Sequence, residues 1–366
     1  MEIRLDAPDG TLVGTLSVPN TGSWDTFERT ETTLSAVDGV HTMYLVSADN
    51  GTYNGDVDWI EFFTADEPDD TDTETDSNED IDTETDIPGS CTPSVNTNIS
   101  VSGTGPYDVV VETNADPGIN EGTIYRPANL DADERFPIYV WGEGACSLNG
   151  ESNSAAMAQI ASYGYFVVAD GTPGNDDGRG MGGDTVSMGA PLLAYVTWAI
   201  TENNKPCSAY YHRLDTSKVA SNGFSCGGLM SIGASGDPRM TTFGYNSSGL
   251  FAENAAIYDA VHTPVLIVEG GLSEMGDPGA TAYDNGLRDY AALSERGWPI
   301  MFFSKNLGHG GDLFTPNGGD FNRINLAWLN WWLKGDESAT GKGFLIGPDC
   351  PFCSDAAWET MSANLP

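Results

Sequence analysis

The sequence is poor in basic residues and very poor in histidine. Its 366 residues include 15 lysines and arginines against 54 aspartates and glutamates, and only four histidines, for a formal net charge of −39. So acidic a chain repels phosphate backbones and anionic lipid surfaces, which argues against nucleic acid and membranes as partners. Because there is no H-E-x-x-H motif and no cluster of histidines, we expect no metal and no other cofactor.

Long apolar runs and cysteines are also scarce. No stretch approaches the roughly 18 consecutive apolar residues of a transmembrane helix. The chain opens on strand-like residues where a signal peptide would stand, and we interpret Met1 as a start placed within a longer secreted precursor. Among six cysteines, Cys350 and Cys353 form the one C-x-x-C pair. A short-range disulfide is favoured over half of a zinc site, and it indicates an oxidising compartment.

Composition divides the chain into three parts. Residues 1–63 alternate apolar and polar residues between Gly, Asn and Asp clusters, as is typical of a β-sandwich. Residues 64–90 are acidic, repeat the sequence DTETD and have almost no apolar residues, which predicts a disordered linker. Residues 91–366 alternate apolar strands with helical runs. This pattern predicts an α/β fold, with a mostly parallel, doubly wound sheet covered by helices on both faces and ligands at the carboxyl ends of its strands.

The most specific motif lies at 219–230. Gly223, Ser225 and Gly227 fit G-x-S-x-G, in which the serine occupies a tight turn between a strand and a helix. We therefore predict that Ser225 is a nucleophile and that the backbone N–H of Cys226 stabilises an oxyanion beside it. In a chain with 44 glycines the motif also arises by chance, so it needs partners elsewhere in the sequence.

A serine hydroxyl needs a histidine to accept its proton and a carboxylate to orient that histidine. His309 lies between glycines after the apolar strand 299–303, and we predict that it is the general base. The acid is expected just after the apolar strand 263–269, where Glu274 fits best and Asp277 is the alternative. An ordinary solvated carboxylate is the simpler interpretation of either residue.

Residues 100–366 resemble the α/β-hydrolase superfamily, in the branch of dienelactone-hydrolase-like and cutinase-like esterases that includes polyester and carbohydrate esterases. The likeness rests on the G-x-S-x-G motif, on the D-T-S-K-V-A sequence at 215–220 and on the T-P-V-L-I strand at 263–267. The chain order of serine, acid and histidine also agrees with this superfamily. Cys226 departs from the methionine that is common after the serine in polyester-degrading members.

The resemblance implies a second oxyanion donor in the loop after an earlier strand, here at Ala145 and Cys146. Because Cys146 and Cys226 would then both border the oxyanion hole, we expect a disulfide between them, which leaves Cys91 to pair with Cys207. Two small buried thiols are the alternative. A cutinase-like member would also have an open apolar groove, for which the candidates are Trp141, Leu229 and Phe251, although each also fits plain core packing.

Residues 1–63 resemble the C-terminal half of a family 6 carbohydrate-binding module. The likeness rests on five short stretches, Arg4–Asp6, Gly14–Leu16, Thr21–Trp24, Gly39–His41 and Asp58–Phe63. It implies that Trp24 stacks on a sugar ring and that Asp56 stands where a polar residue, usually asparagine, hydrogen-bonds the sugar. A partly buried turn aromatic is the alternative interpretation of Trp24.

These features predict a secreted, monomeric serine esterase that hydrolyses acetyl or feruloyl esters on plant or algal polysaccharide. A tethered carbohydrate-binding module would raise the effective concentration of an insoluble substrate. The alternatives are a cutinase-like polyester hydrolase and a non-catalytic polysaccharide-binding protein in which the hydrolase fold is only a scaffold.

Overall fold

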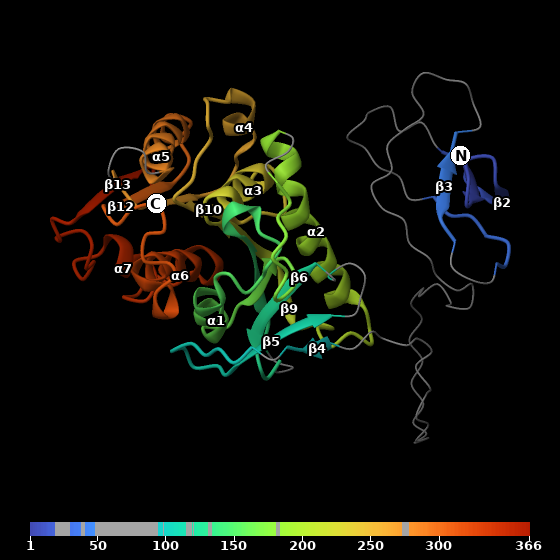
Figure 1. Cartoon of the computed structure of the whole chain (residues 1–366), viewed down its shortest axis with the longest axis horizontal. Coiled ribbons are helices and arrows are strands. Elements are labelled where there is room, and N and C mark those ends of the chain that lie inside the picture. The colour runs from blue at the N-terminus through green and yellow to red at the C-terminus, as the bar shows by residue number, and fades with distance from the viewer. Residues whose placement is uncertain are drawn as a thin grey trace, which may run out of the picture. The chain divides into compact units, whose positions relative to one another are not determined.

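The computed structural model describes residues 1–18, 30–37, 41–47, 94–97, 99–114, 119, 121–130, 134–180, 184–272 and 278–366. The chain divides into two compact units, Met1–Thr83 and Glu84–Pro366 (Figure 1). The predicted linker, residues 64–90, lies outside the described residues. The same holds for five residues with predicted roles: Trp24, Asp56, Cys91, Glu274 and Asp277.

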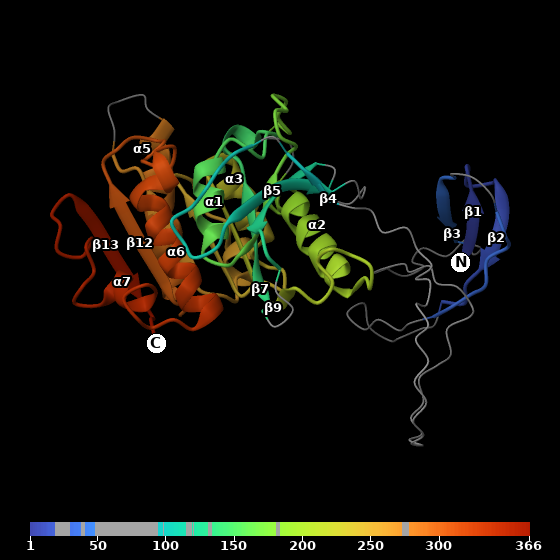
Figure 2. The same cartoon turned by 90° about the horizontal axis from the view of Figure 1, so that it is seen from below.

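The N-terminal unit contains a small antiparallel sheet. Its strands are β1 (Glu2–Leu5), β2 (Thr11–Thr15) and β3 (Met43–Val46), in the order β2-β1-β3 (Figure 2). Ile3 in β1 and Val13 in β2 are buried. Asp6 joins β1 to β3, because its carboxylate accepts the N–H of Thr42 and lies 2.8 Å from His41 Nδ1. The described strands fall inside the apolar-polar runs from which they were predicted.

The C-terminal unit is built on one ten-stranded sheet. Its strands are β4 (Ser94–Asn96), β5 (Val109–Asn114), β6 (Gly122–Pro127), β7 (Phe136–Gly142), β8 (Phe166–Asp170), β9 (Leu214–Gly223), β10 (Thr242–Asn246), β11 (Val265–Glu269), β12 (Ile300–Lys305) and β13 (Trp358–Ala363). They lie in the order β13-β12-β11-β10-β9-β7-β8-β6-β5-β4. Strands β7 to β12 pair in parallel, and the others extend the two edges in antiparallel pairing. The predicted mostly parallel sheet is confirmed.

Helices cover both faces of this sheet (Figures 1 and 2). They are α1 (Ser154–Ser162), α2 (Thr185–Asn204), α3 (Cys226–Ala234), α4 (Ala255–Ala260), α5 (Pro278–Glu295), α6 (Gly319–Lys334) and α7 (Lys342–Ile346), with 3₁₀ turns η1 (Gly144–Cys146) and η2 (Pro316–Gly318). Successive residues of a strand point to opposite faces. In β7, Tyr139 and Trp141 therefore pack with α1 and α6, whereas Ile138 and Val140 pack with α2 and α3.

Carboxylates accept the N–H groups at the starts of α2 and α6. The carboxylate of Asp184 accepts the N–H of Ser187 at the start of α2. The carboxylate of Asp312 accepts the N–H groups of Asp320 and Phe321 at the start of α6. Each cap satisfies N–H groups that have no partner within the helix, so it stabilises the helix start by roughly 1 kcal/mol.

Candidate active site

Ser225 lies on a strained turn between β9 and α3. Its backbone has φ 53° and ψ −117°, a conformation that residues other than glycine rarely adopt. The flanking glycines are required by close backbone contacts. A Cβ at Gly223 would lie 2.2 Å from the oxygen of Gly227, and a Cβ at Gly227 would lie 2.0 Å from the oxygen of Gly142. The turn therefore has the backbone geometry that the G-x-S-x-G sequence predicts.

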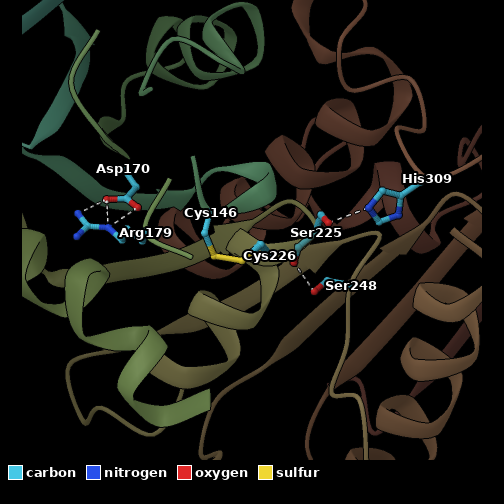
Figure 3. Close-up of a disulfide and its surroundings, with 7 residues drawn as sticks. All are labelled: Cys146, Asp170, Arg179, Ser225, Cys226, Ser248 and His309. Carbon is cyan, nitrogen blue, oxygen red and sulfur yellow. Dashed lines mark hydrogen bonds and ion pairs between the residues drawn. A yellow bond between two sulfur atoms is a disulfide. The ribbon is translucent and has the colours of Figure 1, made fainter. Parts of the chain in front are cut away.

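His309 stands against this serine. Its Nε2 lies 2.8 Å from Ser225 Oγ, within the range of proton transfer (Figure 3). The loop that carries it follows β12 and is held by the loop after β11, since the N–H groups of Leu307 and Gly308 both donate to Gly270 O. The structure thus brings together two residues that are 84 positions apart in the sequence.

The acid that would orient His309 stays a prediction, because Glu274 and Asp277 lie outside the described residues. Glu269, which the sequence analysis did not propose as the acid, ends β11 and is fully buried. Burial raises the pKa of its carboxyl well above the usual value. One of its oxygens accepts the N–H of Ser248, whose hydroxyl donates to Ser225 O (Figure 3). Glu269 therefore supports the turn that carries the serine.

A disulfide joins the serine turn to the loop after β7. Cys146 and Cys226 are bonded and their Cα atoms are 5.1 Å apart (Figure 3). Both predicted disulfides that fall on described residues, Cys146–Cys226 and Cys350–Cys353, are confirmed. Cys207 is also disulfide-bonded, but its predicted partner Cys91 lies outside the described residues.

The same disulfide brings the predicted oxyanion donors to the serine. Ala145 and Cys146 both have positive φ, 55° and 49°, so their backbone is curled into a tight turn. On the other side, the N–H groups of Gly227 and Gly228 donate to Phe224 O and Ser225 O, and Cys226 supplies the first N–H of α3. Backbone N–H groups held in this way beside a nucleophile are suited to stabilising negative charge on a carbonyl oxygen.

An ion pair that the sequence analysis did not predict holds the turn at residues 144–146 after β7, which we call the oxyanion loop because it contains the predicted donors Ala145 and Cys146. Arg179 donates to both carboxylate oxygens of Asp170, a residue with no exposed surface at the end of β8 (Figure 3). Burial lowers the pKa of the Arg179 guanidinium, but the hydrogen bonds and charge of Asp170 outweigh it and raise this pKa. The backbone N–H of Arg179 donates to Cys146 O at 2.8 Å. The pair thereby ties the glycine-rich loop after β8 to the oxyanion loop.

A buried carboxyl lies directly beside the oxyanion loop. Glu143 is fully buried between β7 and η1, and its Oε2 accepts a hydrogen bond from Asn153 Nδ2. Burial, with a smaller contribution from the charge of Asp170, raises the pKa of Glu143 from 4.5 to about 8, against the opposing effect of Asn153 and Trp141. Glu143 is therefore protonated at neutral pH. Its position next to the glycines of the loop was visible in the sequence, but its burial was not.

Two of the three groove candidates are wrong. Trp141 has no exposed surface and Leu229 is 4% exposed, because both point from the sheet and from α3 into the core. Phe251 is 67% exposed, on the loop after β10. An apolar residue type is compatible with a groove or with a core, so sequence alone did not separate the two.

Two aromatic residues that the sequence analysis did not single out extend outward from the histidine. The ring of Phe224, next to Ser225, lies 5.2 Å from the ring of His309. The ring of Phe314 then meets Phe224 edge-on at 5.4 Å. Phe224 is 7% exposed, whereas Phe314 is 60% exposed. The one sequence feature that could have pointed to Phe314 is its position five residues after the predicted base, His309.

The described residues form neither a candidate metal site nor a candidate membrane span. Among them, no three His, Cys, Asp or Glu side chains are grouped so that they could hold a metal ion. The described helices also include none that is long and apolar enough to cross a membrane.

Comparison with known proteins identifies the N-terminal part of the chain. Residues 1–64 match the family described as carbohydrate binding module (family 6). The N-terminal segment carries the sequence of a family 6 carbohydrate-binding module. This confirms the resemblance predicted for residues 1–63.

The curated relatives match the same part of the chain. An arabinoxylan arabinofuranohydrolase of Bacillus subtilis (strain 168) is 48% identical over 54 residues, which are 15% of this chain and 10% of that protein. An endo-1,4-beta-xylanase A of Thermoclostridium stercorarium is 50% identical over 46 residues, which are 13% of this chain and 9% of that protein. The chain therefore spans about a tenth of the length of these relatives.

Proposed function

We propose that Glu84–Pro366 is a serine esterase of the α/β-hydrolase type, which the N-terminal module directs to polysaccharide. The observation that carries this proposal is the 2.8 Å contact between Ser225 Oγ and His309 Nε2, made by a serine on a strained strand-to-helix turn. The sheet supports it, because the serine turn, the histidine loop and the oxyanion loop follow the parallel strands β9, β12 and β7. Because these strands are parallel, their carboxyl ends lie at the same edge of the sheet, and so do the three loops that follow them.

The geometry supports a two-step acyl transfer. His309 takes the proton of Ser225 as Oγ attacks the ester carbonyl, and the oxygen becomes negative beside the N–H groups of Cys226 and the 145–146 turn. His309 then gives its proton to the departing alcohol, which leaves an acyl group on Ser225. A water molecule, activated by the same histidine, hydrolyses this acyl-enzyme and releases the carboxylic acid.

The N-terminal module supports polysaccharide as the substrate. Its relatives are named as enzymes of arabinoxylan and xylan, and those names concern the relatives themselves. For this chain we propose acetyl or feruloyl esters on a xylan-type polysaccharide, hydrolysed outside the cell. A module that holds the chain on an insoluble polymer raises the local concentration of esters around the active site.

Release of acetate and ferulate from esterified xylan tests this proposal. Ser225→Ala should lower the rate by about a thousand-fold or more, because the nucleophile is lost. Ser217→Ala is the matched control, since it removes an exposed hydroxyl at the opposite end of the same strand, β9. If the wild type releases neither acid, or if both variants are as active as the wild type, the proposal is wrong.

A cutinase-like polyester hydrolase is the second candidate. The exposed apolar residues on loops near the carboxyl ends of the strands favour it, since Phe251, Leu272 and Phe314 are 67%, 57% and 60% exposed. An apolar polymer would lie against such a surface. Parallel assays on an aliphatic polyester film and on acetylated xylan separate the two candidates by which substrate is cleaved faster.

A further inference from the structure

The side of the active site that receives the alcohol follows from the position of His309. In acyl transfer the histidine that removes the serine proton later donates it to the leaving oxygen. The alcohol part of the ester must therefore lie beside the imidazole, while the carbonyl oxygen faces the N–H groups near the Cys146–Cys226 disulfide. The alcohol would therefore contact the surface formed by the solvent-exposed side chains that lie next to His309.

That surface is aromatic. Phe224 packs against His309 on one side and against the oxyanion loop on the other, where a Cβ at Gly144 would lie 2.5 Å from its ring. Phe314 contacts the Phe224 ring edge-on and is 60% exposed. An edge-on contact leaves the face of one ring uncovered. Phe314 thus extends a continuous aromatic wall from the imidazole to solvent.

The loop that presents Phe314 is held in place by its own hydrogen bonds. The N–H of Gly311 donates to Gly308 O, and both the N–H and the hydroxyl of Thr315 donate to Asp312 O. The carboxylate of Asp312 is fixed in turn on the first N–H groups of α6. A ring held on such a turn is already oriented before a ligand binds, which lowers the entropic cost of stacking on it.

We infer that Phe314 is the platform on which the sugar ring that bears the ester stacks, as the leaving alcohol of the reaction. This inference rests on the esterase function proposed above. A pyranose presents an apolar face of C–H groups that matches an exposed aromatic ring, and its hydroxyls remain in water.

Two pairs of substrates isolate the alcohol side of the site. Within each pair the acyl group is constant and the alcohol differs: ethyl acetate with acetylated xylo-oligosaccharide, and ethyl ferulate with feruloylated xylo-oligosaccharide. The wild-type full chain is assayed on both pairs, and the pair that it cleaves faster is used for the variants. Phe314→Ala should lower kcat/KM on the sugar ester by about three- to ten-fold and leave the ethyl ester within about two-fold.

Two further variants exclude a general loss of structure. Phe314→Trp should retain the preference for the sugar ester, since it keeps an exposed ring. Ile346→Ala, which removes an exposed apolar side chain on α7, should change neither substrate. Each variant should react with an organophosphonate at the wild-type rate, because this reaction requires Ser225 and His309 and no sugar.

The outcomes distinguish this inference from the proposed function. Cleavage of both esters by the wild type, with equal losses or no loss in Phe314→Ala, overturns the role of Phe314 and leaves the esterase intact. A loss on the sugar ester in Ile346→Ala as large as that in Phe314→Ala also overturns it. A wild type that cleaves no ester and does not react with the organophosphonate overturns the esterase function itself.

Discussion

Arg179 and Asp170 form an ion pair that connects two loops of the candidate active site. The buried carboxylate of Asp170 accepts hydrogen bonds from Nε and Nη2 of Arg179, at 3.0 and 2.9 Å. The hydroxyl of Tyr195 donates to the same carboxylate at 2.7 Å. Through the bond from Arg179 N to Cys146 O, this cluster sets the position of the oxyanion loop relative to Ser225. We therefore expect Arg179 to be a positioning residue in the proposed reaction, acting through the N–H groups that it orients.

Removing this pair should lower kcat more than it raises KM. In Arg179→Ala the oxyanion loop loses its support, so stabilisation of the transition state falls while binding of the ground state changes little. We expect kcat to fall about ten-fold, with KM within about two-fold, in steady-state assays of ester hydrolysis. Arg239→Ala, which breaks the Arg239–Asp237 ion pair elsewhere on the unit, is the control and should change neither constant. A rise in KM alone would contradict this role.

The two described disulfides should differ in what they contribute to stability. Cys146–Cys226 closes a loop of 80 residues, whereas Cys350–Cys353 closes one of three. A longer loop loses more entropy in the unfolded chain when it is closed. We expect the double Cys→Ser variant of the first pair to lower the free energy of unfolding by about 2–4 kcal/mol, and that of the second by about 1–2 kcal/mol. Denaturant unfolding curves measure both.

The Cys146–Cys226 disulfide should also matter for catalysis, since it joins the two predicted oxyanion donors. A mild reductant that opens it should reduce kcat, and reoxidation should restore activity. Equal losses of activity in the two double variants would show that the position of the Cys146–Cys226 bond beside Ser225 has no special role.

Glu143 predicts a pH dependence of stability with a definite sign. In the unfolded chain this carboxyl ionises near pH 4.5, whereas in the folded protein it keeps its proton until about pH 8. Because the folded state binds the proton more tightly, stability is greatest below the lower value, falls as pH rises through this window and levels off above about pH 8. Glu143→Gln cannot ionise and should remove this part of the slope.

Thermal unfolding of the two proteins at several pH values measures this effect. At pH 9 the Glu143→Gln variant should be the more stable, by an amount on the order of a few kcal/mol, and at pH 4 the two should be similar. Glu151→Gln, which changes a partly exposed carboxyl in the turn that follows the oxyanion loop, is the control and should follow the wild type. Parallel curves for Glu143→Gln and wild type would mean that Glu143 is not a buried acid.

How much of this site could be predicted depended on how local each signal was. The G-x-S-x-G sequence specifies its own turn through backbone contacts among Gly223, Gly227 and Gly142, and Ser225 could be named from it. His309 could be named from chain order and its glycine neighbours. The Asp170–Arg179 pair could not, because it joins the end of one strand to a loop nine residues later through a contact that no periodicity encodes.

The fold shows the same division. Strands β8 and β11 were predictable, because a short run of apolar residues is typical of a strand buried in a parallel sheet, and all five residues of each strand are buried. Strand β13 was not, since its residues alternate weakly and most are partly exposed at the edge of the sheet. Helix α5 was missed because its sequence is polar and begins beside a segment rich in glycine and acidic residues. Trp141 and Leu229 were misplaced in a groove because burial depends on which side of an element a residue occupies.

The most direct test of the central claim is covalent labelling of the intact chain with a fluorophosphonate, followed by mass spectrometry of its peptides. An activated serine predicts one adduct per chain, located on Ser225, lost in Ser225→Ala and formed at least about a hundred-fold more slowly in His309→Ala. Absence of any adduct, or an adduct on a different serine that persists in Ser225→Ala, would contradict the assignment of these two residues as nucleophile and base.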